Sequence, residues 1–280
     1  MTQEKIYQPD NAIRNGYFRI ILDILSELNS NRWLIYQLFK RDLLSVYKQS
    51  MLGIVWAFIF PVVSVGTFIV LNRSGIFNID STGIPYPVFA ITGMAYWQLF
   101  SNSITSSSGS LVKAGNMIVK INFSRKSLVI ASLGQSVLTF LVQVILVISA
   151  FIYFGIPPGW KVLLFPLFIM PIVLFALGLG FFLSILNGIA RDIGNIISIL
   201  MTFFMFLTPV LYPVPATGFL AKLSAVNPMH YLISFPRDII LTGHSGAGDG
   251  FIWSACLSVL IFFIGIFIFH LTEARVSERI

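Results

Sequence analysis

Long apolar runs separated by short polar segments fill the chain from about residue 51 to residue 271. A bilayer core about 30 Å thick requires about 20 apolar residues in a helix that rises about 1.5 Å per residue. Six runs reach or approach this length, and we therefore expect an all-α membrane protein with six transmembrane helices. The six runs are residues 51–71, 88–100, 128–154, 163–186, 196–212 and 251–271.

These six runs are unequal. The first contains Pro61, which is expected to kink or interrupt its helix. The second passes directly into the polar run 101–110, and the fifth is the shortest. Within the fourth, small residues recur at intervals of four positions, which lets helices approach closely in lipid, either within one chain or between two copies. These small residues are Ala176, Gly180, Ser184 and Gly188.

The polar lead-in over residues 1–50 has a helical pattern of its own. One group of apolar residues follows the i, i+3, i+4, i+7 spacing of a single helix face. Its members are Tyr17, Ile20, Ile21, Ile24, Leu25 and Leu28. A second stretch, residues 33–47, is less regular because Asp42 interrupts its apolar stripe. We expect amphipathic helices that lie in the membrane interface, the alternative being helices that pack on a partner protein.

The distribution of charge predicts which side of the membrane each segment faces. Only 10% of the residues are charged, against about 25% in soluble domains, so the chain cannot cover a water-facing surface. Most lysines and arginines fall in segments 1–50, 111–127, 187–195 and the C-terminal tail, which six crossings place together. This side, with both termini, is expected to be cytoplasmic. The net charge of +7 then faces an anionic leaflet, and no nucleic-acid partner is expected.

The expected organisation has three parts. Residues 1–50 form a cytoplasmic amphipathic lead-in, residues 51–271 a six-helix transmembrane domain, and residues 272–280 a cytoplasmic tail. Inside the domain, segment 111–127 is a basic cytoplasmic loop and segment 212–250 lies on the outer side. The latter holds apolar stretches, 219–226 and 231–235, that are too short to cross the bilayer and too apolar for a solvated loop. Outward-side re-entrant helices buried against protein would explain them, and a simple extracellular cap is the alternative.

The sequence lacks the motifs of an enzyme. It contains no phosphate-binding G-x-x-x-x-G-K-[ST] loop, no G-x-S-x-G elbow and no H-E-x-x-H helix. A membrane transferase would need His230 or His244 beside a carboxylate such as Asp238. The third histidine, His270, lies at the end of the last apolar run. Cys256 lies alone in an apolar run, so no metal cluster is expected. The six runs contain no Asp or Glu to couple transport to ions, so the energy is expected from a separate ATPase.

Several motifs occur in a fixed order along the chain. Residues 33–61 follow the pattern R-D-L-x-x-x-Y-K-x-S-x-L-G-x-x-W-x-x-x-x-P. The pattern falls on Arg41, Asp42, Leu43, Tyr47, Lys48, Ser50, Leu52, Gly53, Trp56 and Pro61. Residues 114–128 read AGNMIVKINFSRKSL. Further matches are Asn187, Arg191 and Asp192, Thr208 with Pro209, Asn227 with Pro228, and Arg237 with Asp238.

With these motifs the chain resembles the membrane (permease) subunits of ABC exporters for bacterial surface polysaccharides, the ABC transporters of the second export type. Their substrates include O-antigen, capsule and teichoic acid. One departure is Ser124, which stands where the family usually has a proline. The resemblance implies a homodimer in the bacterial cytoplasmic (inner) membrane that binds two copies of an ABC ATPase. ATP and Mg²⁺ would be bound by that ATPase, and this chain would be a transport subunit with no cofactor of its own.

The resemblance also implies roles for particular residues. The loop between the second and third spans would supply a coupling helix that docks on the ATPase. Its residues would be Lys113, Asn116, Met117, Ile118, Val119, Lys120 and Asn122, and an ordinary basic loop is the alternative. The motif pairs from Arg41 to Asp238 would have structural or interface roles, and segment 212–250 would supply gate helices.

A lipid-linked, O-antigen-like glycan is the expected substrate. Sugar rings stack their apolar faces on aromatic side chains, so aromatic residues near the spans are candidates for the substrate path. The candidates are Tyr47, Trp56, Trp97, Phe100, Phe203, Phe204 and Phe206, with Ser101 and Asn102 as a polar lining. Aromatic residues also serve as interface anchors or face lipid, which is the alternative role. The residues do not separate O-antigen from capsular polysaccharide or teichoic acid, nor from a drug or lipid exporter of the same class.

Overall fold

The computed structural model describes residues 24, 26–48, 55–74, 84–115, 124–156, 165–214 and 216–276. Every regular element within these ranges is a helix. The helices are α3 (Arg32–Lys48), α4 (Val55–Arg73), α5 (Tyr86–Ser108), α6 (Ser110–Lys113), α8 (Arg125–Ala131), α9 (Leu133–Tyr153), α10 (Phe165–Ile189), α11 (Asp192–Leu207), α12 (Phe219–Val226), α13 (Pro228–Thr242) and α14 (Gly248–Val276). The prediction of an all-α protein is confirmed for the described residues.

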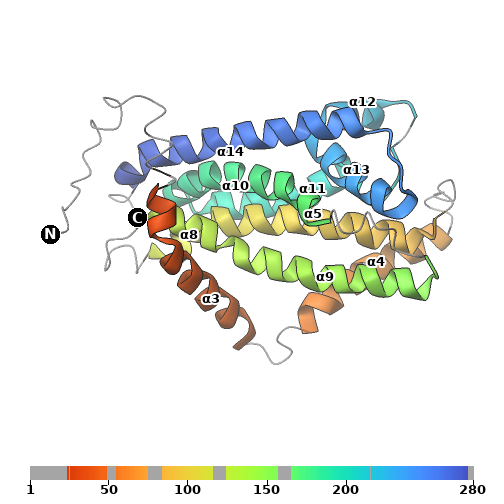
Figure 1. Cartoon of the computed structure of the whole chain (residues 1–280), viewed down its shortest axis with the longest axis horizontal. Helices are drawn as coiled ribbons and strands as arrows, with labels where there is room; N and C mark the ends of the chain where they lie inside the picture. Colours follow the sequence, from red (N-terminus) through yellow and green to blue (C-terminus); the bar gives the residue numbers. More distant parts are fainter. Residues whose placement is uncertain are drawn as a thin grey trace.

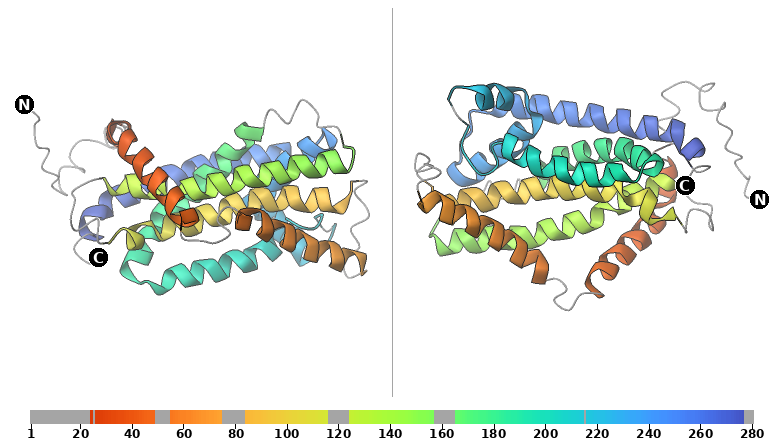
Figure 2. Two further views of the ribbon diagram at one scale, coloured as in Figure 1. Left: turned by 90° about the horizontal axis from the view of Figure 1, so that it is seen from below. Right: turned by 180° about the vertical axis from the view of Figure 1, so that it is seen from behind.

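Helix α5 occupies the centre of a bundle of long helices that run side by side (Figures 1 and 2). It packs against α4, α9, α10, α11 and α13, and α10 packs in turn along α14. Every residue of α5 from Val88 to Phe100 is buried. The second apolar run is therefore the protein-facing core of the bundle.

Three helices are long and apolar enough to cross a membrane: Arg125–Tyr153, Leu167–Ile189 and Gly248–Glu273. They correspond to the third, fourth and sixth apolar runs of the sequence. Pro61–Leu71 of α4 and Asp192–Leu207 of α11 are shorter apolar helices, and the serine-rich second half of α5 lowers its hydropathy. The chain is thus a multi-pass membrane protein, and the count of six crossings stays a prediction.

Close contact between helix backbones depends on glycine at two places. A side chain at Gly265 of α14 would collide with the backbone of Gly178 on α10. A Cβ atom at Gly180 would lie 2.5 Å from Cβ of Ser107 on α5. The predicted stripe of small residues on α10 therefore serves packing inside one chain at Gly180, as small residues do between membrane helices.

The lead-in is amphipathic where it is described. Ile24 is buried, and Leu38 on α3 joins it in an apolar cluster with residues of α8, α10 and α14. On the opposite face of α3, Trp33 and Tyr36 are 70% and 56% exposed. Exposed aromatic rings beside a buried apolar face are typical of a helix at a membrane interface. Residues 17–23 of the predicted first helix lie outside the described residues.

The predicted outer segment contains two short helices, as expected from its proline-broken apolar stretches. Helix α12 begins and ends at the predicted residues, and α13 extends from Pro228 to Thr242. They lie at the end of the bundle opposite α3, and α13 packs against α14 and α5 (Figure 1). Their insertion into the outer leaflet stays a prediction.

Candidate functional site

A buried lysine joins three parts of the chain at the end of the bundle that carries α3. The side chain of Lys126, on the first turn of α8, has no exposed surface. Its Nζ lies 3.0 Å from Oε2 of Glu27 in the lead-in and 2.5 Å from Oε1 of Glu273 on α14. The neighbouring Arg125 donates to the backbone carbonyl of Glu273 at 2.8 Å. We call Lys126, Glu27 and Glu273 the inner ion cluster.

This cluster flanks the predicted coupling segment. Helix α6 ends at Lys113 and α8 begins at Arg125, so the segment leaves and re-enters the fold at the same end of the bundle. Ser124, the departure from the family pattern, is extended (φ −64°, ψ 117°) and makes no side-chain cap, and α8 starts directly after it. The other coupling residues lie outside the described residues: Asn116, Met117, Ile118, Val119, Lys120 and Asn122.

Arg237 anchors α13 to the bundle at the opposite end. Its guanidinium is buried and lies 3.8 Å from the ring centroid of Phe89 on α5. Its Nη1 donates to the carbonyl oxygens of Val210 at 3.1 Å and Pro209 at 3.4 Å, in the turn after α11. Its Nε lies 3.6 Å from Asp238 Oδ1. Arg237 therefore ties α13 to α5 and α11, and we call these contacts the outer clamp.

Two asparagines order the turns at either end of α11. The side chain of Asn227 accepts from the Met229 amide at 3.0 Å and donates to Thr208 Oγ1 at 2.9 Å. With Pro228 in the first turn, it starts α13 as a cap does. Asn187 at the other end of α11 accepts from the Gly194 amide at 2.9 Å and donates to the Ser108 carbonyl at 3.0 Å.

The remaining motif residues have simpler surroundings. Arg41 and Asp42 form an ion pair with a 2.7 Å contact, and Pro61 is buried within α4. Arg191 and Asp192 are exposed at the start of α11. Gly53 and the side chain of Lys48 lie outside the described residues.

His230 and Arg237, at the end of the bundle that carries α12 and α13, have perturbed pKa values. Burial, together with the charge of Arg237, lowers the pKa of His230 to about 4, so its ring is neutral at pH 7. Burial also lowers the pKa of Arg237 to about 10, against the opposing effect of Asp238, and the guanidinium stays charged. His230 lies 3.4 Å from the Ser234 hydroxyl, whereas His244 lines an open pocket with Asp238. In the described ranges no three His, Cys, Asp or Glu side chains could share a metal ion.

Residues 34–241 match the family described as ABC-2 type transporter. The chain belongs to this family. It is accordingly a transport subunit with several membrane-spanning helices, and the resemblance expected from its motifs is confirmed.

The ABC-2 transporter chain is similar to proteins named O-antigen export system permease protein RfbA. It is 27% identical to the one from Myxococcus xanthus over 267 residues, which are 93% of this chain and 100% of the relative. A relative of the same name from Klebsiella pneumoniae is 28% identical over 223 residues, 75% of this chain and 81% of its own. A second from that organism is 26% identical over 222 residues, with the same coverage.

In this ABC-2 transporter chain, two predicted substrate-path aromatics lie inside the bundle. Trp97 and Phe100 are 3% and 4% exposed. The ring of Phe100 stacks on Phe175 of α10, with centroids 5.6 Å apart, and contacts Trp97 at 5.7 Å. Both rings are core residues in this arrangement, and their place on a substrate path stays a prediction. The polar candidates Ser101 and Asn102 follow them on α5 and are half-buried.

The other path candidates lie on the surface. Trp56 on α4 is 54% exposed, and the three phenylalanines on α11 are between 45% and 63% exposed: Phe203, Phe204 and Phe206. Both views in Figure 2 place α4 and α11 on the same side of the bundle, flanking α5. We call this side the α4–α11 face. The side chain of Tyr47 lies outside the described residues.

Two features of the ABC-2 transporter chain escaped sequence reasoning. Lys126 counted only as a basic residue of a cytoplasmic loop, whereas it is fully buried between two carboxylates. Gln143 of α9 donates to Gln98 of α5 in the bundle core. The available signal was the pair of amide side chains within apolar runs, since buried polar groups require partners.

Proposed function

We propose that the chain is the transmembrane subunit of an ATP-driven ABC transporter that exports a lipid-linked polysaccharide of the O-antigen type across the bacterial cytoplasmic membrane. One observation carries this proposal: the similarity to an O-antigen export permease covers 93% of this chain and the full length of the relative. The family match over residues 34–241 supports the same reading. Both termini would be cytoplasmic, as the distribution of lysine and arginine predicts.

The working assembly would be a homodimer that binds two ATPase subunits. The exposed residues of α4 and α11 support this proposal because many of them are large and apolar, including Val62, Val63, Ile196 and Ile199. Exposed apolar surface of this kind is covered by lipid or by protein. If a second copy covers it, Trp56 and the α11 phenylalanines would line the passage between the two copies.

Force from the ATPase would enter through the coupling segment and reach the bundle through its flanking helices. Lys126 lies directly after this segment and bonds to both the lead-in and α14. A displacement of α8 would therefore move the lead-in and the inner end of α14 together. The outer clamp would hold α13 to α5 while the inner end moves. ATP and Mg²⁺ belong to the ATPase in this scheme.

The proposal is tested by complementation. A bacterial strain that lacks its O-antigen export permease would receive this chain together with its cognate ATPase, and surface polysaccharide would be measured by immunoblot of intact cells. We expect export to return, and to be lost with an ATPase that binds but does not hydrolyse ATP. Absence of surface glycan despite correct membrane insertion of both chains would contradict the O-antigen assignment. Export of a capsular or teichoic polymer instead would change the assigned substrate and leave the assignment as an exporter in place.

Two sets of substitutions test the mechanism in the same strain. Replacing Met117 and Ile118 by Asp should abolish both transport and stimulated ATP hydrolysis, since apolar docking on the ATPase would be lost. Trp56→Ala and Phe203→Ala should reduce export while the complex stays assembled. Ile252→Ala, on the exposed surface of α14, is the matched control for loss of an exposed apolar side chain.

A further inference from the structure

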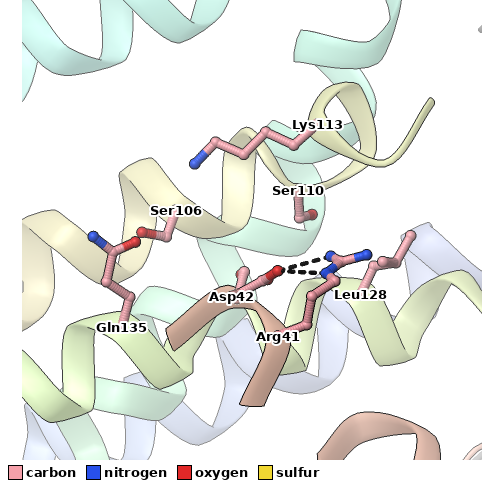
Figure 3. A pocket seen from close by; sticks show the side chains of 8 residues that line it. Arg41, Asp42, Ser106, Ser110, Lys113, Leu128 and Gln135 are labelled. Atoms are coloured by element: carbon pink, nitrogen blue, oxygen red, sulfur yellow. Dashed lines mark hydrogen bonds and ion pairs between the residues drawn. The ribbon is translucent and has the colours of Figure 1, made fainter. Parts of the chain in front are cut away.

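A cavity of about 230 Å³ lies at the inner end of the bundle, where α3 crosses α5, α6, α8 and α9. Its lining differs from the apolar surfaces around it because nearly every side chain is polar or charged (Figure 3). The lining residues are Arg41, Asp42, Ser106, Ser110, Lys113, Leu128, Ser132 and Gln135. The function proposed above leaves this cavity unused.

The lining is rich in hydrogen-bond donors with a positive balance. Arg41 and Lys113 supply two cations against the one carboxylate of Asp42, which binds Arg41 at 2.7 Å. Figure 3 shows the Lys113 ammonium, the Ser106 hydroxyl and the Gln135 amide around the same space. An ammonium, a hydroxyl and an amide can all donate to one oxyanion. The site therefore fits an anion and not a cation.

The other two hydroxyls serve the fold. Ser110 donates to the carbonyl of Ser107 at 2.7 Å, and Ser132 donates to the carbonyl of Val129 at 2.7 Å. Ser132 Oγ also lies 3.3 Å from Ser107 Oγ, so both hydroxyls are engaged within the fold. The donors that face the cavity come from three different helices, α5, α6 and α9, so only the assembled bundle brings them together.

The position of the cavity indicates where the anion comes from. One wall is α3, whose exposed Trp33 and Tyr36 are typical of the membrane interface. The phosphate groups of lipids lie at this level, between the hydrocarbon and the water. Lysine and arginine at the membrane surface attract anionic lipid. A lipid phosphate could thus reach the cavity beside α3 without entering the hydrocarbon.

We propose that this cavity binds the phosphate group of a lipid, with Lys113, Ser106 and Gln135 donating to its oxygens and the Arg41–Asp42 pair closing the α3 side. Only the biological role of this site rests on the proposed function: in a glycan exporter, the site would hold the phosphate linker of the lipid-linked substrate before transport. The same chemistry suits an anionic membrane phospholipid, and the experiment separates these two sources.

The experiment uses the full chain in phosphatidylcholine nanodiscs, without ATPase or glycan. Three probes are titrated: farnesyl diphosphate, phosphatidylglycerol and inorganic diphosphate. Lys113→Gln removes the cation, Lys113→Arg keeps it, and Lys222→Gln on α12 removes an equal charge from an exposed position at the other end. Ser106→Ala removes a donor without changing charge. Lys113 is exposed, so these variants should fold, and near-ultraviolet circular dichroism checks this.

We expect Lys113→Gln to weaken binding about ten-fold, as loss of one charged hydrogen bond does. Ser106→Ala should weaken it about three-fold, while Lys113→Arg and Lys222→Gln should stay close to the unaltered chain. An effect confined to farnesyl diphosphate identifies the substrate linker, and one confined to phosphatidylglycerol identifies a membrane lipid. Either supports the phosphate site.

Three results would overturn the proposal. Binding of every probe could be unchanged in Lys113→Gln, or Lys222→Gln could weaken binding equally, which would indicate only net charge. In a separate binding measurement with the ATPase added, Lys113→Gln could weaken association with the ATPase while leaving all lipid binding unaffected, which would assign the cavity to that protein. If the complementation test fails while lipid binding still depends on Lys113, the proposed function is wrong and the phosphate site stands.

Discussion

Removal of the Lys126 ammonium tests how far the inner ion cluster stabilises the protein. Lys126→Met keeps most of the length and the apolar stem of the side chain and deletes its ammonium, with the charge and the hydrogen bonds to Glu27 and Glu273. Glu27 and Glu273 then lose their shared cation while they stay at 16% and 15% side-chain exposure. Removing the lysine is costly because two buried carboxylates lose their closest cation, and His270 lies further from Glu273, at 3.6 Å.

The magnitude follows from the distances. The two carboxylate oxygens lie 3.0 and 2.5 Å from Nζ, so they are at most about 5.5 Å apart. At an effective dielectric constant of about 20, two unit charges at this separation repel each other by about 3 kcal/mol. Broken buried pairs cost about 3–5 kcal/mol, and the partial exposure of both carboxylates favours the lower value. For a chain of this size about 3 kcal/mol lowers the unfolding midpoint by about 5 °C.

The assay is thermal unfolding of the purified full chain in nanodiscs, followed by tryptophan fluorescence. The decisive comparison is the triple variant Lys126→Met with Glu27→Gln and Glu273→Gln, which should recover most of the loss because the two carboxylates no longer repel each other. Lys222→Met, an exposed lysine, should change the free energy of unfolding by less than about 0.5 kcal/mol. If Lys126→Met unfolds at the same temperature as the unaltered chain, or the triple variant is less stable than the single one, the reasoning is refuted.

Three further substitutions test the outer clamp, the close helix contact and the perturbed histidine. Arg237→Gln should lower the free energy of unfolding by about 2–4 kcal/mol, because Phe89 and two carbonyls lose a buried cation. Arg237→Lys, which keeps the charge, should lose less. Fluorescence unfolding measures both variants, and an equal loss of stability would contradict a role for the charge. Gly265→Leu should push α14 away from α10 at Gly178 and destabilise the chain by more than about 3 kcal/mol. The control Val259→Leu, at an exposed position of α14, should change stability by less than about 1 kcal/mol. Equal effects of the two variants would contradict the close approach of the helices. The pKa of His230 is about 4 in the folded chain and about 6.5 when unfolded, so the unfolded state binds the extra proton. Stability should be full above pH 6.5 and fall by a few kcal/mol as the pH drops towards 4. His230→Gln should flatten this slope in a pH series of unfolding midpoints, and an unchanged slope would assign it to other groups.

Local pattern determined the helices of this protein to a large extent. The third, fourth and sixth apolar runs became three helices long enough to span a membrane, because apolar length alone sets that property. The Asn227–Pro228 pair ends α12 at its predicted residue, because the two residues begin a new helix, α13, at that point. The ordered motifs predicted the transporter family, which the comparison over residues 34–241 confirms.

The contacts between helices were decided only by the tertiary structure. Periodicity indicates which face of a helix is apolar, and not which neighbour that face meets. Lys126 finds its partners 99 and 147 positions away, and the polar cavity beside α3 takes its donors from three helices. Apolar length cannot distinguish α5, which is enclosed by protein, from α10 and α14, whose outer faces are exposed. The sequence by itself therefore determined that this chain enters a membrane as helices, while packing decided which charges are buried, because burial depends on contacts between residues far apart in the chain.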